Sequence, residues 1–342
     1  MYPLSQRPRP GRVPAGGPPV RPRTDAVLIL RHWHELPPPV IILAPPRSFT
    51  SVVCAMLGQH PQMYGFPETH LFSEDTLDRW LIRADRATYP MGHGLVRAVA
   101  QLYFGGQDAH TVALAQRWLR ARRGVTTEFI FKALADRVFP AMPVDKSPST
   151  VNNTKTLLGV RRKLPAAKFL HLLRHPRGHG ESVMRFMAER EKHGPIPARH
   201  WLMEISRPDG DDAPLDPQRG WYARNTMIRD FLAEVPAADR LAVRGEDLLA
   251  APDRVLPEIA GWLGLRTDAR AIDAMKHPER SPFAFLGPPG ARYGNDAFFL
   301  QAPALRAARA RGHRLDGPLR WRPDGQGFTP DVTALAREFG YT

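Results

Sequence analysis

The sequence predicts an α/β fold in which helices cover a central parallel sheet. Short apolar runs occur at 39–43, near Val144, at 169–173 and at 241–243, and they alternate with longer helical patterns. Such runs are typical of strands buried on both faces. Alternation of strands with helices is typical of a parallel sheet between helical layers. A chain of 342 residues, 43% of them hydrophobic, is long enough to bury the core of such a domain.

Composition divides the chain into a domain and flanking regions. The first 25 residues hold seven prolines and five arginines, so we expect residues 1–26 to form a disordered tail. The domain is expected at 38–300, with a helical insertion at about 73–137 and a C-terminal extension at 301–342. Residues 191–220 are rich in proline, glycine and acids, and they are interpreted either as a lid over the acceptor or as an exposed loop without a function.

The first strand leads directly into a candidate anion site. The run Val40–Leu43 is followed by Ala-Pro-Pro-Arg-Ser-Phe-Thr-Ser and then by a helix predicted over Val52–Leu57. At such a junction, free backbone N–H groups and the positive end of the helix dipole face the ligand. The loop adds a guanidinium and three hydroxyls, which suit phosphate oxygens, from Arg47, Ser48, Thr50 and Ser51. The nucleoside-triphosphatase motif G-x-x-x-x-G-K-[ST] does not occur in the chain.

A second strand ends in a similar arrangement. The run Lys168–Leu173 is followed by Arg174-His175-Pro176 and by a helix predicted from residue 178 to 191, with Ser182 in its second turn. Ligands bind at the carboxyl ends of strands in open α/β sheets. We therefore expect Arg174 and Ser182 to reach the same ligand as the first loop.

Together the two segments resemble the cofactor-binding loops of the sulfotransferases that use 3′-phosphoadenosine-5′-phosphosulfate (PAPS). The first loop follows that family's 5′-phosphosulfate pattern, P-[KR]-S-G-[ST]-[ST], except that Phe49 replaces the glycine. We expect Phe49 to have a negative φ and a ring turned away from the phosphate. The second follows the family's 3′-phosphate signature, R-[DH]-P with a serine eight positions after the arginine. The resemblance spans about 38–300 and implies a P-loop-like nucleotide-binding sulfotransferase fold of the bacterial natural-product type.

Three further segments resemble the same family. Residues 144–149 resemble its [DE]-K-[ST]-P segment, Trp221 with Asn225 resembles its W-x-x-x-N helix, and residues 241–248 resemble a strand-to-helix junction. Gly245 stands at that junction where the family usually has an aromatic residue. Any stacking on the adenine is therefore expected to come from elsewhere.

The resemblance implies an enzyme that transfers a sulfuryl group from PAPS and releases 3′,5′-adenosine bisphosphate (PAP). The acceptor would be a hydroxyl, or less readily an amine, on a small molecule, a glycolipid or a carrier-tethered chain. The cofactor-binding residues would be those of the two loops and a later arginine in a glycine-containing loop: Arg47, Ser48, Phe49, Thr50, Ser51, Arg174, Ser182 and Arg292. Arg292 is interpreted either as a contact to the 3′-phosphate or as part of an ordinary turn.

Four residues are candidates for the chemistry. Arg47 would stabilise charge on the leaving oxygen. Lys146 is interpreted either as a second cation near the sulfonate or as half of a surface ion pair with Asp145 or another acid. Glu68 is the first choice for the base, since burial beside phenylalanines could raise its pKa toward neutrality. His70 is the alternative base, because imidazole titrates near neutral pH.

Composition also bears on partners and location. The net charge of +14 suits an anionic cofactor or an acidic partner, and a GC-rich genome explains it equally well. No nucleic-acid-binding motif accompanies the charge, and no H-E-x-x-H metal motif occurs. The single cysteine, Cys54, excludes an internal disulfide and favours a cytoplasmic location, with Cys54 packed between helix and sheet. No apolar run approaches the ~20 residues that span a membrane, and no secretory signal is found.

Two other functions remain open at the level of sequence. A P-loop-like small-molecule kinase would share the strand–loop–helix cradle but would need a Walker lysine and a magnesium ligand. A catalytically degenerate, basic protein that only binds PAP is the second alternative, because Phe49 and Gly245 both depart from the family pattern.

Overall fold

The computed structural model describes residues 30–87, 89–192, 215–306 and 313–342. Its centre is a five-stranded, all-parallel sheet with the strand order β2-β3-β1-β4-β5. The strands are β1 (Val40–Leu43), β2 (Met63–Gly65), β3 (Met142–Asp145), β4 (Lys168–Leu173) and β5 (Arg240–Arg244). This arrangement confirms the predicted α/β class. The predicted tail 1–26 and most of the predicted lid 191–220 lie outside the described residues.

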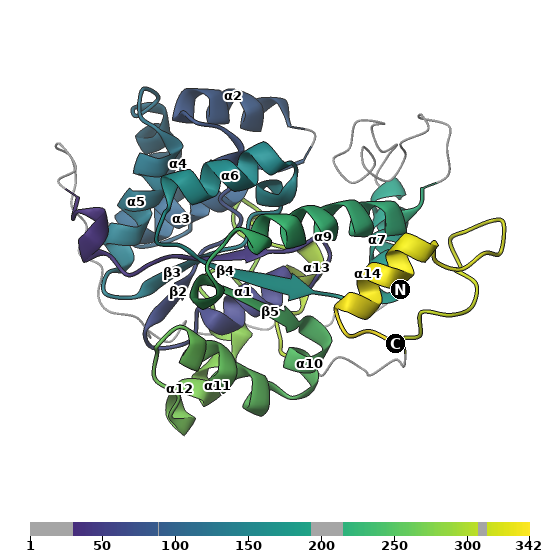
Figure 1. The fold of residues 1–342 in the computed structure, drawn as a ribbon. Helices are drawn as coiled ribbons and strands as arrows, with labels where there is room; N and C mark the ends of the chain where they lie inside the picture. Colours follow the sequence, from purple (N-terminus) through teal and green to yellow (C-terminus); the bar gives the residue numbers. More distant parts are fainter. Residues whose placement is uncertain (1–29, 88, 193–214, 307–312) are drawn as a thin grey trace, which may run out of the picture.

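Helices cover both faces of the sheet (Figure 1). The helices of the first half of the chain are α1 (Thr50–Leu57), α2 (Leu77–Arg86), α3 (His93–Phe104), α4 (Ala109–Arg120), α5 (Thr127–Val138), α6 (Thr154–Lys163) and α7 (Pro176–Glu191). Those of the second half are α9 (Pro217–Ala233), α10 (Gly245–Ala250), α11 (Pro252–Trp262), α12 (Ala269–Met275), α13 (Ala297–Gln301) and α14 (Pro330–Glu338). The stretch 73–137 carries α2 to α4 and most of α5. No helix within the described ranges is both long and apolar enough to cross a bilayer.

The alternation of side chains along the strands separates two cores. Ile41 and Leu43 of β1 pack into a cluster that includes residues of α3, α5, α6 and α9. Val40 and Ile42 point to the other face, into a cluster with residues of α1, α11 and α12. All four side chains are at most 2% exposed, as expected of a strand covered on both sides.

The edge strand β2 was not predicted from the sequence. It is only three residues long, and it pairs with β3 through Met63, Tyr64 and Gly65. Three residues are too few for a period-two pattern to stand out from a loop.

The C-terminal segment packs onto the side of the domain that carries the second candidate loop. Val332, Leu335 and Ala336 of α14 form a buried cluster with Leu173 of β4 and Trp221 of α9. In Figure 1, α14 accordingly lies beside α9. The family resemblance offered no expectation for this segment, because it ends near residue 300.

Candidate active site

The loop between β1 and α1 has an unusual backbone. Arg47 and Phe49 have φ values of 71° and 64°, in the left-handed region. The prediction of a negative φ for Phe49 was therefore wrong. A left-handed conformation costs about 1–2 kcal/mol for a residue with a side chain, and such strain is concentrated at functional loops. The turn carries Arg47 out of the strand and brings Ser48 and Ser51, both buried, to the start of α1.

The second loop meets the first at the carboxyl end of the sheet. Strands β1 and β4 are neighbours, with Leu43 paired to His171, so both loops leave the sheet side by side. Arg174 donates a hydrogen bond from Nη1 to the carbonyl oxygen of Arg47. Arg47 Nε in turn lies 3.4 Å from the hydroxyl of Ser182 on α7. The structure thus brings together the three residues that the sequence assigned to one ligand.

Two polar atoms at this junction are buried without a hydrogen-bond partner among the described residues. They are the Ser48 hydroxyl and Nε of Arg174. Burying a polar group unpaired is costly, so both atoms are suited to bind the oxygens of an anion. Burial lowers the pKa of Arg174, and that of Arg47, to about 10. Both side chains therefore remain cations at neutral pH.

The helix α9 holds the second loop in place. Trp221 donates its indole N–H to the carbonyl oxygen of Arg174 at 2.8 Å. One turn later, Asn225 accepts a hydrogen bond from His171 Nε2 at 3.0 Å and donates to the carbonyl oxygen of Trp221 at 2.9 Å. This gives a physical reason for the W-x-x-x-N spacing, because it ties the helix to β4 and to the loop that follows it.

The ring of Phe49 fills the space beside Gly245 that a side chain at position 245 would need. The guanidinium carbon of Arg174 lies 4.2 Å from the centre of the Phe49 ring. A Cβ atom on Gly245 would lie only 2.5 Å from Cδ2 of the same ring. The phenylalanine in the first loop and the glycine in the junction are therefore complementary departures from the family pattern.

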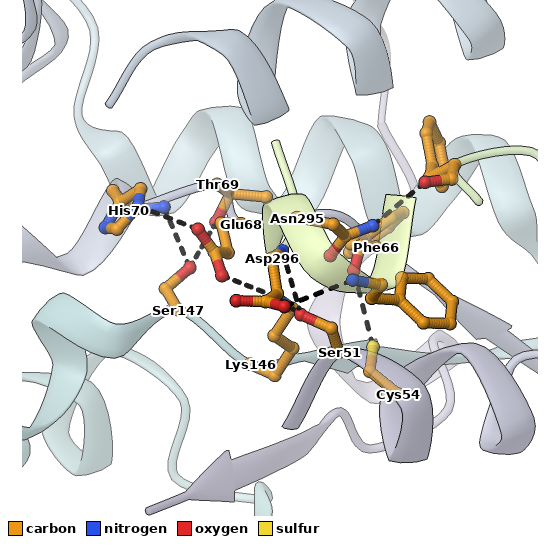
Figure 2. A network of polar contacts seen from close by, with 12 residues as sticks. Ser51, Cys54, Phe66, Glu68, Thr69, His70, Lys146, Ser147, Asn295 and Asp296 are labelled. Carbon is orange, nitrogen blue, oxygen red and sulfur yellow. Dashed lines mark hydrogen bonds and ion pairs between the residues drawn. The ribbon is translucent and has the colours of Figure 1, made fainter. Parts of the chain in front are cut away.

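A buried network joins the candidate base to the first loop (Figure 2). Lys146, whose side chain is wholly buried, donates from Nζ to Glu68 Oε1 at 2.6 Å and to the Ser51 hydroxyl at 2.8 Å. On its other side, Glu68 Oε2 lies 3.7 Å from Nε2 of His70. The interpretation of Lys146 as half of a surface ion pair was wrong as to the surface, because its side chain is buried and turned toward the first loop; the acid that it pairs with is Glu68 and not Asp145. Asp145 instead accepts a hydrogen bond from the Thr69 hydroxyl at 2.7 Å.

The electrostatic state of Glu68 differs from the prediction. Burial raises the pKa of this carboxyl group, but the charge of Lys146 and the interactions with His70 outweigh it, and the pKa falls to about 2. The expected rise toward neutrality was wrong, because the sequence did not show that Lys146 would be packed against the carboxylate. Glu68 is ionised and oriented at neutral pH.

A cavity of about 590 Å³ opens over these groups. Its polar lining includes Arg47, Thr50, Ser51, Glu68 and Arg174, and its apolar lining includes Tyr89, Pro90, Phe186, Leu286, Phe298 and Phe299. Arg292 is exposed and also lines the cavity. His70 does not line it, and its Nδ1 lies 2.9 Å from the Ser149 hydroxyl.

One residue of the site was missed in the sequence. Asp296 lines the same cavity, and its carboxylate forms an ion pair with Nη1 of Arg47. The only local signal was that of a helix N-cap, since an aspartate precedes the apolar run of α13. That signal contains no information about a partner almost 250 positions earlier in the chain.

Histidine and cysteine side chains in this region have structural roles. His171, His175 and His179 are spaced by four residues, as in some metal-binding pairs, yet His171 bonds Asn225, His175 caps α7, and His179 lies 3.0 Å from the carbonyl oxygen of Pro46. Within the described ranges, no group of three metal-ligating side chains is found. Burial raises the pKa of the Cys54 thiol to about 12, so this thiol is unreactive.

Comparisons with known proteins identify the family and the fold of the chain. The model of the family described as "Sulfotransferase family" matches residues 38–269. The fold is similar to that of a sulfotransferase domain from the curacin biosynthetic pathway, with 20% identity over 90% of this chain and 98% of that chain and a TM-score of 0.68.

A second similar structure is the sulfotransferase domain of the olefin synthase of Synechococcus PCC 7002. It shares 24% identity over 89% of this chain and 95% of that chain, with a TM-score of 0.66. No curated protein sequence matches the chain. Because the family model covers more than half of its length, the chain belongs to the sulfotransferase family and is an enzyme of that family.

Proposed function

We propose that this enzyme transfers a sulfuryl group from PAPS to a hydroxyl, or less readily an amine, of a small-molecule, glycolipid or carrier-tethered acceptor. The observation that carries the proposal is the meeting of the two loops. Arg47 contacts Ser182 through Nε and Arg174 through its carbonyl oxygen, and both arginines line one cavity with Glu68. Two cationic loops at one edge of a parallel sheet suit a donor with phosphate groups at both ends.

The donor side of the site consists of the two loops. Arg47 would stabilise charge on the oxygen that leaves the sulfur, and its contribution is electrostatic, because a guanidinium does not readily give up a proton. Arg174 and Ser182 would hold the 3′-phosphate, with Arg292 at the rim. The unpartnered Ser48 hydroxyl and Arg174 Nε would gain acceptors from the donor's oxygens.

The acceptor side is assigned to Glu68. In the transfer, the acceptor oxygen forms a bond to sulfur, the bond from sulfur to the bridging phosphate oxygen breaks, and the hydroxyl proton passes to a base. Glu68 lines the cavity and His70 does not, which favours Glu68 as that base. Lys146 and Ser51 lie between Glu68 and the first loop, where they can neutralise charge on the sulfonate oxygens.

The nature of the acceptor is inferred from the cavity wall. Aromatic and aliphatic side chains line much of the cavity, which favours an acceptor with an apolar portion beside its hydroxyl. The two similar structures are a domain from the curacin biosynthetic pathway and a domain of an olefin synthase. This supports an acceptor from secondary metabolism. A cytoplasmic location is proposed as well, consistent with a free, buried Cys54.

Calorimetric titration with PAP, and separately with ATP and magnesium, tests the proposal. We expect binding of PAP that does not depend on magnesium, at least about tenfold weaker in Arg47→Ala and Arg174→Ala because each removes a charged hydrogen-bond donor. Arg254→Ala, an exposed arginine on α11, is the matched control and should bind normally. Binding of ATP–magnesium in place of PAP would support a kinase, and normal PAP binding by both variants would overturn the site.

The base is tested by Glu68→Gln. We expect turnover of PAPS with an identified acceptor to fall by about 10²–10⁴-fold, while PAP affinity changes only a few fold. Glu258→Gln makes the same change at an exposed position of α11 that does not line the cavity, and it should keep its turnover. Equal turnover in Glu68→Gln and the wild type would move the base to His70. PAP binding without any turnover in the wild type would identify a degenerate binding protein.

A further inference from the structure

The segment from Tyr293 to Asp296 lies beyond the part of the chain that the family model matches, yet it is bound to both halves of the site. The carbonyl oxygen of Gly294 accepts a hydrogen bond from the backbone N–H of Glu68 at 2.7 Å. The backbone N–H of Asp296 donates to the Ser51 hydroxyl at 3.1 Å (Figure 2). This close contact requires glycine, because Gly294 has a φ of 115° and a Cβ there would lie 2.7 Å from Cα of Gly94.

The carboxylate of Asp296 is held rigidly and divided between two partners. One oxygen accepts hydrogen bonds from the backbone N–H groups of Phe298 and Phe299, both at 3.1 Å, and so caps α13. The other oxygen forms the ion pair with Arg47. The pair is largely buried, with side-chain exposures of 14% for Arg47 and 22% for Asp296. A carboxylate anchored in this way offers a fixed point for the guanidinium.

The surroundings of Arg47 come equally from two parts of the chain. The guanidinium carbon lies 5.2 Å from the ring centre of Phe186 and 5.4 Å from that of Phe298. Nε approaches Ser182, and Nη1 pairs with Asp296. Helix α7 therefore supplies one ring and one polar contact, and the segment after residue 292 supplies the other ring and the other polar contact.

We infer that Asp296 is a positioning residue for Arg47 that also competes with the donor for the same guanidinium. The inference rests on the proposed function, in which Arg47 faces the leaving oxygen. Asp296 aligns the guanidinium between the two rings before the donor arrives. The donor's anionic group must then share Arg47 with the carboxylate of Asp296. The ion pair therefore aligns the guanidinium and at the same time lowers the affinity for the donor.

The isosteric variant Asp296→Asn separates this role from a merely structural one. Asparagine can still cap α13 but provides no negative charge. We expect PAP to bind about 3–10-fold more tightly, because a competing anion beside the anion site has been removed. We expect the chemical step to slow about tenfold, because the guanidinium is no longer held in line. Loss of structure alone would weaken both binding and turnover.

The measurements are PAP affinity by calorimetry and the rate at which ³⁵S-labelled PAPS is hydrolysed, with water in place of the acceptor. Asp268→Asn is the matched control, since Asp268 caps α12 and pairs with Arg266 far from the cavity; both quantities should stay unchanged. Weaker or unchanged PAP binding in Asp296→Asn, or an unchanged rate of hydrolysis, would overturn the inference. Failure of the proposed function looks different, because the wild type would then either not bind PAP or bind PAP without turning over PAPS.

Discussion

At the scale of single residues, Phe49 and Gly245 form a complementary pair. The Phe49 ring occupies the space that a side chain at position 245 would need, and it packs against the guanidinium of Arg174. We expect Gly245→Ala to displace the ring and to weaken PAP binding about tenfold, because Arg174 moves with it. We expect the double variant Phe49→Gly, Gly245→Ala to lose less than the sum of the single losses, with a coupling energy of about 1–2 kcal/mol.

The control for Gly245→Ala is a glycine-to-alanine change at a position where the added methyl group contacts no other residue. Gly261 on α11 has no atom within 4 Å of a built Cβ, so Gly261→Ala should leave PAP binding unchanged. Losses that simply add in the double variant would show that the two positions act independently, and the contact between ring and glycine would then have no bearing on Arg174.

At the scale of elements, α14 packs against the residues that hold the second loop in place, although it lies beyond the residues that the family model matches. Leu335 is buried at 3% exposure in the cluster with Leu173 and Trp221. We expect Leu335→Ala to lower the free energy of unfolding by about 2–4 kcal/mol through the cavity it leaves. Weaker PAP binding should accompany the loss, because Trp221 bonds the carbonyl of Arg174. Urea unfolding and calorimetry measure the two effects.

The control for α14 lies on its exposed side. Among the described residues, Glu338 forms an exposed ion pair with Arg229, and such pairs contribute at most about 1 kcal/mol. Glu338→Ala should therefore be close to the wild type in both measurements. A Leu335→Ala protein as stable as Glu338→Ala would mean that α14 is not part of the cooperative fold.

At the scale of the whole molecule, neutral buried histidines make stability depend on pH. Burial lowers the pKa of His171 to about 4 and of His175 and His179 to about 3, with nearby positive charge adding to the effect at His175 and His179. The unfolded chain, with a histidine pKa near 6.5, binds more protons below that pH. The stability that the neutral histidines contribute is complete above about pH 6.5 and is lost as the pH falls toward 4 for His171 and toward 3 for His175 and His179.

Urea unfolding at pH 7.5, 6.0 and 5.0 measures this loss. We expect the free energy of unfolding to decrease at each step, and the decrease to be smaller in His171→Gln, whose side chain does not titrate. His110→Gln, at an exposed position of α4, should show the full decrease of the wild type. The same decrease in all three proteins would show that protonation of His171 does not oppose folding. The low pKa of Glu68 also makes the folded protein less stable as the pH falls. This effect begins only below about pH 4.5, the ordinary pKa of a glutamate, which applies in the unfolded chain.

Much of the fold and part of the site could be predicted from the sequence. Strands β1, β3, β4 and β5 were predicted because short apolar segments that alternate with helical patterns are typical of strands in a parallel sheet. The meeting of Arg47, Arg174 and Ser182 was predicted because parallel strands end at one edge of the sheet. The partners of Glu68 and Lys146 could not be predicted, since neither a buried ion pair nor the pKa that follows from it has a local sequence pattern.

The sequence by itself determined the α/β class, the family and the positions of the two candidate loops, because each depends on residues close together in the chain. Only the tertiary structure decided how those residues act. It placed Asp296 on Arg47, Lys146 on Glu68 and Phe49 over Gly245, and it turned the backbone of Phe49 to a positive φ. Charge, close packing and burial act through space, between segments that may be far apart in sequence, so they follow from folding and not from local composition.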